Sequence, residues 1–318
     1  MVASIWVALP IREEAVRRVY VTVTKRMQEH APASTRDRSS LVVLDWDAGA
    51  VVAQHWIEVT RGSERGQSRG CRGLAVHDGA LYVAVHPDVL QRRNLDALDV
   101  EEEFRVPGLV EVHQLQSRGG ALWVISTGSN EVLLLRKHEV AERRTALTPR
   151  AEEYVSTWRL GDAYSQDRLH FNSIGWGPNG EELHVYSDSN AVFDATAQRV
   201  AWFGHPLHKP HNACYCSAHE VVVNSSAVKM TVVLDLVNHV SRTIYRDDRV
   251  PPSNGVDVAL VGWTRGLALH GRTAFIGVAP GEAVAVDVPS GEVVGRVSFS
   301  DDPRDAPFAV LLDPRDWK

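Results

Sequence analysis

The feature that most constrains this chain is a segment that occurs five times with one internal pattern. Each copy begins with Arg or His, forms a short, partly apolar strand, turns at a polar residue and returns as a second strand. The copies are RGLAVHDGALYVAVH from 72, HQLQSRGGALWVIST from 113, HFNSIGWGPNGEELHVYSD from 170, HNACYCSAHEVVVNSS from 211 and RGLALHGRTAFIGVA from 265. A unit that returns in this way indicates a fold built by repetition.

The spacing of the copies identifies the kind of repeat. Their starts are 41, 57, 41 and 54 residues apart, and a four-stranded propeller blade typically repeats at about 40 to 50 residues. Polar insertions at 142–168 and 246–257 account for the two longer intervals. Apolar runs around a turn at 41–59, 231–246 and 283–299 have the form of the outer hairpin of a blade.

The sequence therefore predicts an all-β chain, with residues 1–318 forming one β-propeller domain of six four-stranded blades. The copies supply five blades, and the two ends of the chain supply the sixth. In that blade 19–26 is the second strand and 306–313, APFAVLLD, is the innermost strand. Pairing of the N- and C-terminal segments closes the ring and removes an open sheet edge. Seven blades remain the alternative.

The lead residue of each copy predicts a site in the central channel. The first strand of a propeller blade lines this channel, so we expect the lead residues to form a ring at one mouth. Three consecutive blades contribute His113, His170 and His211. Neutral imidazoles on rigid strands suit a divalent transition metal, Zn, Fe or Cu, with a coordination position left open.

Four other residues complete the predicted site. Arg72 and Arg265 lead the flanking copies, and a guanidinium beside a metal suits a carboxylate or phosphate on a substrate. Asn172 and Asp305 are the candidate catalytic residues, Asn172 as a hydrogen-bond donor and Asp305 as a general base. His208, in HKPHN, either replaces or joins His211 as a ligand. The competing interpretation is that the histidines and arginines are structural polar groups in the channel.

Composition excludes several classes of function. The net charge of −6 and pI of about 6.2 do not give the basic surface of a nucleic-acid-binding protein. No apolar run approaches the roughly 18 residues of a membrane span. Three cysteines do not form a disulfide framework, and the N-terminus lacks a basic signal-peptide region, so the expected location is the cytoplasm.

The repeated elements resemble those of a bacterial family of uncharacterised propeller proteins. RGLAVHDGALYVA, ALWVIST, HFNSIGW, HKPHNACYCSAHEVVVNSS and TRGLALHGRTAFIGV occur there in similar form and order, over roughly residues 70 to 315. More distantly they look like the six-bladed gluconolactonase and strictosidine-synthase-like propellers. The resemblance implies a fold and no reaction, because gluconolactonase-like propellers hold their metal through Glu, Asn and Asp and this chain offers His.

These observations predict a metal-dependent enzyme that acts on a small anionic molecule at the channel mouth. A lyase, hydrolase or isomerase is favoured over an oxygenase, since nothing indicates an electron-supplying cofactor. The alternative is a non-catalytic propeller that binds a ligand or a protein partner.

Overall fold

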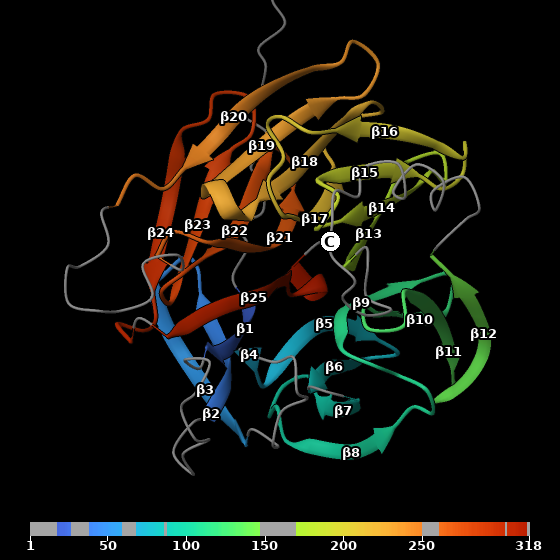
Figure 1. Ribbon diagram of the computed structural model, residues 1–318. Coiled ribbons are helices and arrows are strands. Elements are labelled where there is room, and N and C mark those ends of the chain that lie inside the picture. Colours follow the sequence, from blue (N-terminus) through green and yellow to red (C-terminus); the bar gives the residue numbers. More distant parts are fainter. Residues whose placement is uncertain are drawn as a thin grey trace, which may run out of the picture.

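Six antiparallel sheets surround a common axis in the computed structural model, and Figure 1 shows them along that axis. The structure describes residues 18–26, 38–58, 68–85, 88–146, 170–249, 261–302 and 304–316. Each sheet has four strands in consecutive order from the axis outward, apart from one short extra strand. The predicted six-bladed β-propeller is confirmed, and the seven-bladed alternative is not needed.

The blades follow one another along the chain. The first contains β25 (Asp305–Leu312), β1 (Arg18–Arg26), β2 (Arg38–Asp45) and β3 (Ala50–Glu58), with β4 (Ser68–Arg69) paired to β1. The second contains β5 (Cys71–His77), β6 (Ala80–Val85), β7 (Val89–Asn94) and β8 (Val100–Arg105), and the third β9 (Val112–Arg118), β10 (Ala121–Ser126), β11 (Glu131–Arg136) and β12 (Glu139–Thr145). The fourth contains β13 (Phe171–Trp176), β14 (Glu182–Tyr186), β15 (Ala191–Asp194) and β16 (Arg199–Phe203), and the fifth β17 (Pro210–Tyr215), β18 (Glu220–Ser225), β19 (Met230–Asp235) and β20 (Val240–Arg246). The sixth contains β21 (Thr264–His270), β22 (Thr273–Val278), β23 (Glu282–Asp287) and β24 (Val293–Ser298), and two 3-10 helices are η1 (Ser226–Val228) and η2 (Pro314–Asp316).

The C-terminal strand closes the ring as the sequence predicts. β25 pairs antiparallel with β1, from Val19 opposite Leu312 to Lys25 opposite Asp305. The closure carries an ion-pair cluster, because Lys25 Nζ lies 2.6 Å from an oxygen of Asp305 and 2.7 Å from an oxygen of Asp302. The first and last strands therefore belong to one sheet.

The core lies between neighbouring blades rather than at the axis. The middle strands of a blade are covered on both faces, as in β6, where every residue is buried. The outermost strand faces solvent, as in β8, where five of six residues are exposed. Apolar clusters fill each interface, for example between the blades of β6 and β10. This packing holds the six inner strands side by side around the channel.

Two glycines allow neighbouring inner strands to approach closely. A Cβ on Gly73 would lie 2.7 Å from the backbone nitrogen of Leu115, and one on Gly266 would lie 2.7 Å from that of Val310. Gly266 also has a φ of +70°, where a side chain is strained. In each of the Arg-Gly pairs at 72–73 and 265–266, the arginine is a predicted channel residue. The glycine that follows it is the point where the neighbouring inner strand comes closest.

Both predicted insertions lie largely outside the described residues. β12 extends to Thr145 and β20 to Arg246, so each insertion begins later than predicted. In the part of the chain that the structure describes, no helix is long and apolar enough to cross a membrane.

Candidate functional site

The strand register shows which of the five lead residues are equivalent. In each of the five blades, the fourth residue of the second strand pairs with Leu74, Leu115, Ser173, Ala213 or Leu267 on the inner strand. Two residues earlier stand Arg72, His113, Phe171, His211 and Arg265. By this count Phe171, rather than His170, stands at the position of the other four, and each of these strand pairs has a register shift close to this position.

His170 has a left-handed backbone, as do Glu111 and Lys209, which stand two residues before His113 and His211. The φ of His170 is +47°, and the following Phe171, which takes the equivalent position, is fully buried in the core. The imidazole of His170 still reaches the ring. Its centroid lies 5.0 Å from that of His113 and 6.3 Å from that of His211. The structure thus brings the three predicted histidines together, by a different local route from the expected one.

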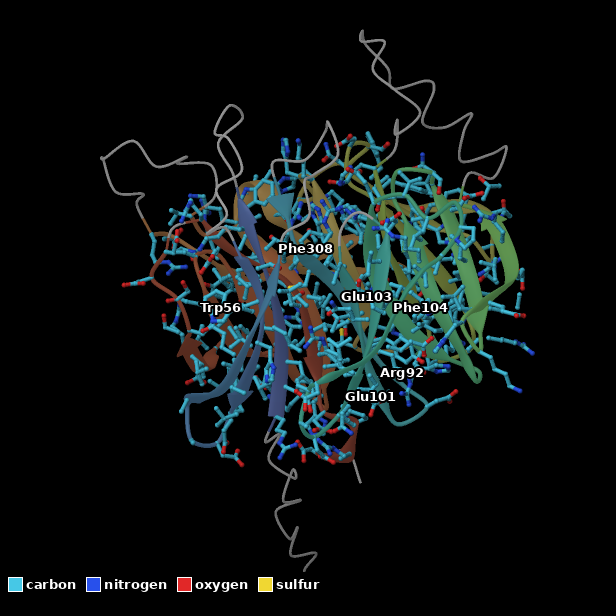
Figure 2. All side chains as sticks on the ribbon, turned by 90° about the horizontal axis from the view of Figure 1, so that it is seen from below. Trp56, Arg92, Glu101, Glu103, Phe104 and Phe308 are labelled. Carbon is cyan, nitrogen blue, oxygen red and sulfur yellow. The ribbon has the colours of Figure 1, made fainter. Side chains whose placement is uncertain are left out.

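Two aromatic residues of the ring were not predicted. Phe308 lies at the bulge of β25, with its ring centroid 5.2 Å from that of His113. The guanidinium carbons of Arg72 and Arg265 lie 5.3 and 4.8 Å from the Phe308 ring centroid. Trp263 lies 5.0 Å from the guanidinium carbon of Arg265. Figure 2 shows Phe308 in the upper half of the molecule, above Arg92 and Glu101. Both arginines therefore stack on one phenyl ring.

The hydrogen bonds of His211 assign its tautomer. Nδ1 lies 2.9 Å from the carbonyl oxygen of Lys209 and 3.0 Å from Oγ of Ser226. Ser226 donates its own proton to the carbonyl oxygen of Thr264 at 2.6 Å, so towards His211 it accepts. Nδ1 therefore carries the proton, and Nε2 presents a lone pair. His211 is 4% exposed, and among the described residues Nε2 has no hydrogen-bond partner.

The electrostatics of the ring keep the imidazoles of His113 and His211 neutral. Burial lowers the pKa of His113 well below its usual range, and the charges of Arg72, His170 and Arg265 lower it further. Burial, Arg265 and His170 act in the same direction on the pKa of His211. Both imidazoles are therefore uncharged at neutral pH, and the two arginines supply positive charge to the ring.

Three other predicted residues take positions outside these contacts. Asn172 donates from Nδ2 to the carbonyl oxygen of Pro210 at 2.9 Å, which joins the fourth and fifth blades. Asp305 accepts from Lys25 at 2.6 Å and from Oγ of Ser300 at 2.6 Å. Asn172 Nδ2 thus serves interblade packing, and the Asp305 carboxylate serves ring closure. His208, the alternative to His211 in the HKPHN segment, is exposed, and of these two histidines His211 belongs to the ring.

The ring borders a cavity within the channel. Of the ring residues, His113 is among those that line a cavity of about 710 Å³, which runs along all six inner strands towards their C-terminal ends. Asn172 and Asp305 are not among its lining residues. The channel therefore has two parts, the polar ring at the strand starts and a larger space beyond it.

The geometry does not directly support the prediction that His113, His170 and His211 bind a metal ion. In the described part of the chain, no three His, Cys, Asp or Glu side chains are arranged to hold a metal ion. At His113, Nη1 of Arg72 lies 3.2 Å from Nδ1. A guanidinium beside an imidazole disfavours a second cation there.

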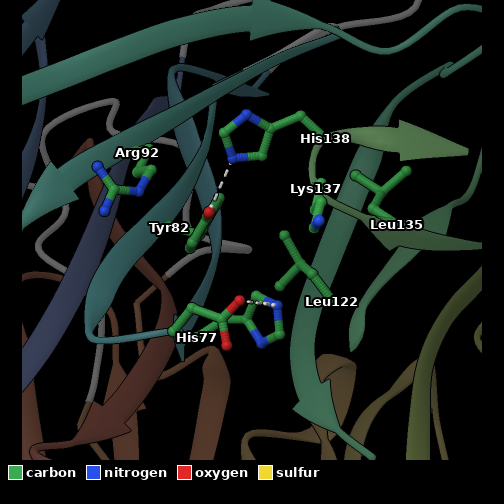
Figure 3. A pocket seen from close by; sticks show the side chains of 8 residues that line it. His77, Tyr82, Arg92, Leu122, Leu135, Lys137 and His138 are labelled. Atoms are coloured by element: carbon green, nitrogen blue, oxygen red, sulfur yellow. Dashed lines mark hydrogen bonds and ion pairs between the residues drawn. The ribbon is translucent and has the colours of Figure 1, made fainter. Parts of the chain in front are cut away.

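Two further pockets lie between blades, and their polar groups are already paired. Figure 3 shows the one of about 300 Å³, where Tyr82 Oη lies 2.9 Å from Nε2 of His138, and Nδ1 of His77 lies 3.0 Å from Oγ of Ser117. In the other, of about 370 Å³, Nε2 of His184 lies 2.7 Å from a carboxylate oxygen of Glu182. The ring and the channel are therefore the stronger candidates for a ligand site.

Comparison with known proteins supports the fold alone. No family model matches the chain, and no curated protein matches it. A crystal structure of a protein of unknown function from Bacteroides caccae has 13% sequence identity and a TM-score of 0.56, covering 92% of this chain and 98% of that chain. A chain of a nidogen/laminin complex has 8% identity and a TM-score of 0.58, covering 92% and 97%. Virginiamycin B lyase from Staphylococcus aureus has 15% identity and a TM-score of 0.48, covering 74% and 71%. The expected resemblance to uncharacterised propellers thus holds at the level of the fold.

Proposed function

We propose that the ring binds a small anionic molecule, a carboxylate or phosphate ester, that carries a proton donor next to its anionic group. One observation carries this proposal: the buried Nε2 of His211, which has no hydrogen-bond partner among the described residues, belongs to a ring that also holds two arginines. Arg72 and Arg265 would bind the anion, and His211 would accept the neighbouring proton.

The arginines favour an anion on electrostatic grounds. Both stack on Phe308, with Arg72 buried and Arg265 partly buried, so two positive charges lie beside the same phenyl ring. Their joint effect on the pKa of His113 indicates a positive local potential. A planar guanidinium matches carboxylate and phosphate with paired hydrogen bonds.

The neutral base suggests the reaction class. An unprotonated imidazole beside a bound carboxylate can take a proton from the adjacent carbon, while the arginines stabilise the negative charge that develops. Elimination and isomerisation both begin in this way, so a lyase or isomerase is favoured. A hydrolase would use the same base on a water molecule. The alternative is a ligand-binding propeller without turnover.

A binding screen tests the proposal. We expect malate, succinate, glycerol 3-phosphate or inorganic phosphate to raise the Tm of the wild-type protein, and malate to bind more tightly than succinate because of its hydroxyl group. Arg72→Met and Arg265→Met should each weaken binding about tenfold or more, since a charge-assisted hydrogen bond contributes about 1.5–3 kcal/mol. Arg72→Lys should not restore it.

Exposed Arg136 provides the matched control, and Arg136→Met should bind like wild type. Equal affinity in wild type and both ring variants would overturn the proposal, as would the absence of binding by all four anions. Binding without conversion of any of them would favour the non-catalytic alternative.

A second candidate function retains the transition metal. The carbonyl of Lys209 fixes Nδ1 of His211 and leaves Nε2 as a free lone pair, as the outer partner of a metal-bound imidazole does. His113 has the same contact, with Nδ1 3.2 Å from the carbonyl oxygen of Glu111. His113, His170 and His211 would then hold Zn, Fe or Cu after small side-chain movements. Mass spectrometry of wild type and the three single Ala variants tests this, and equal metal content in all four would exclude it.

A further inference from the structure

The cavity beyond the ring has a wall of apolar and neutral polar groups and, among its lining residues, a single fixed charge. Its lining includes Leu74, Leu269 and Leu312 from three inner strands. Among its lining residues, Arg118 is the one Asp, Glu, Lys or Arg. Burial raises the pKa of Tyr215, another lining residue, to about 12, so its phenol is neutral at pH 7. A ligand that fills this space therefore meets apolar surface, neutral polar groups such as Gln116 and Ser117, and one guanidinium.

Arg118 is held in position by aromatic stacking. It is the last residue of β9, and its guanidinium carbon lies 4.0 Å from the ring centroid of Trp176, the last residue of β13. Trp176 packs edge to face on Trp123, with centroids 5.1 Å apart. The indole nitrogen of Trp123 donates to the carbonyl oxygen of Arg118 at 3.2 Å. Arg118 and Trp176 are thus preorganised at the end of the channel away from the ring.

Three buried polar atoms at this end have no hydrogen-bond partner among the described residues. They are Nη1 of Arg118, Nε1 of Trp176 and Oε1 of Gln116. Gln116 donates from Nε2 to the carbonyl oxygen of Ile174 at 2.8 Å, which fixes its amide and leaves Oε1 as an acceptor. A buried polar atom without a partner costs about 1–3 kcal/mol. In the two interblade pockets, by contrast, the polar groups described above satisfy one another.

We infer that this end of the channel is a second binding site, for an apolar molecule with a carboxylate group. The guanidinium of Arg118 stacks on the indole ring of Trp176, and in this proposal one carboxylate accepts from the guanidinium and from the indole N–H. The apolar body then lies along the leucines of the inner strands. The oxygen of Gln116 favours a hydroxyl or amide group on the same molecule. This inference stands independently of the anion proposed for the ring, because Arg72 and Arg265 do not line this cavity.

Calorimetry with eight-carbon probes tests the inference. Octanoate should bind the wild-type protein with a dissociation constant of about 1 mM or lower. Octan-1-ol should bind at least tenfold more weakly, and octylamine should not bind, because Arg118 repels its charge. Arg118→Met should reduce octanoate affinity about tenfold or more, whereas the exposed control Arg136→Met should leave it unchanged within twofold. Loss in Arg72→Met without loss in Arg118→Met would place octanoate in the ring and overturn the inference.

Trp176→Phe keeps the aromatic stack and removes only the N–H donor, so it covers the case in which Arg118→Met does not fold. We expect a several-fold loss of octanoate affinity with an unchanged circular-dichroism spectrum. Equal affinity for octanoate and octan-1-ol would overturn the inference, as would the absence of octanoate binding at millimolar concentration or full affinity in Trp176→Phe.

Discussion

Nη1 of Arg72 lies 3.2 Å from Nδ1 of His113, and the same imidazole nitrogen lies 3.2 Å from the carbonyl oxygen of Glu111. The guanidinium can only donate, and the carbonyl can only accept. The neutral imidazole therefore satisfies one of these neighbours at a time. With Nδ1 accepting from Arg72, His113 presents an N–H at Nε2, which suits an anion. With Nδ1 donating to Glu111, it presents a lone pair, which suits a metal.

Arg72→Met should raise the pKa of His113. The charge of Arg72 is the largest electrostatic cause that lowers this pKa after burial, so its removal makes the protonated imidazole less costly. In the folded protein, His113 should then bind its proton at a higher pH than in wild type. An NMR titration of the histidine side chains measures this, with exposed Arg136→Met as the control. An unchanged pKa would show that the Arg72 charge is neutralised in solution.

Added methyl groups at the interstrand glycines should destabilise the ring of inner strands. Gly73→Ala places Cβ 2.7 Å from a backbone nitrogen, and overpacking of this kind costs about 1–3 kcal/mol. Gly266→Ala should cost about 1 kcal/mol more, because its φ is +70°. Gly79→Ala is the control, since its φ is +72° and nothing lies within 4 Å of its Cβ. Urea denaturation measures all three. If Gly79→Ala costs as much as Gly73→Ala, close approach is not the reason.

Lys25→Met should weaken the closure of the first blade. The variant leaves Asp305 buried without its cation, and breaking a buried ion pair costs about 3–5 kcal/mol. The loss should be full at pH 7. It should shrink as the pH falls below the ordinary range of Asp, because the pKa of Asp302 is lowered in the folded protein and its contribution disappears on protonation. Chemical denaturation at pH 7 and pH 3 measures the two values.

Arg304→Met is the control for this closure, because Arg304 is half exposed where it pairs with Asp302 and should contribute less than about 1 kcal/mol. A Lys25→Met loss equal to that of Arg304→Met, or one that stays constant with pH, would contradict the role given to the cluster.

The fold could be predicted from the sequence because every blade repeats one pattern, and the strand at 306–313 has the register of RGLAVHD. The site could be predicted only in part. The register shifts of the inner strands cannot be read from the letters, so the one-residue offset at His170 was not predicted. Phe308 was not predicted as a ring residue, because the strand at 306–313 does not begin with Arg or His as the five repeated segments do. Asn172 and Asp305 lie where strand spacing puts them, but their partners belong to other strands, and tertiary packing decides which polar atoms stay available.

The tautomer of His211 is the most direct test of the account, because both the proton acceptor and the electrostatics of the ring depend on it. Nitrogen-15 NMR of histidine-labelled protein, assigned with the His211→Gln variant, measures the protonation of each ring nitrogen. At pH 7 we predict a neutral His211 with a protonated Nδ1 and an unprotonated Nε2, and we expect this state to persist as the pH falls through about 6.5. A protonated Nε2, or an imidazolium at pH 7, would contradict the account.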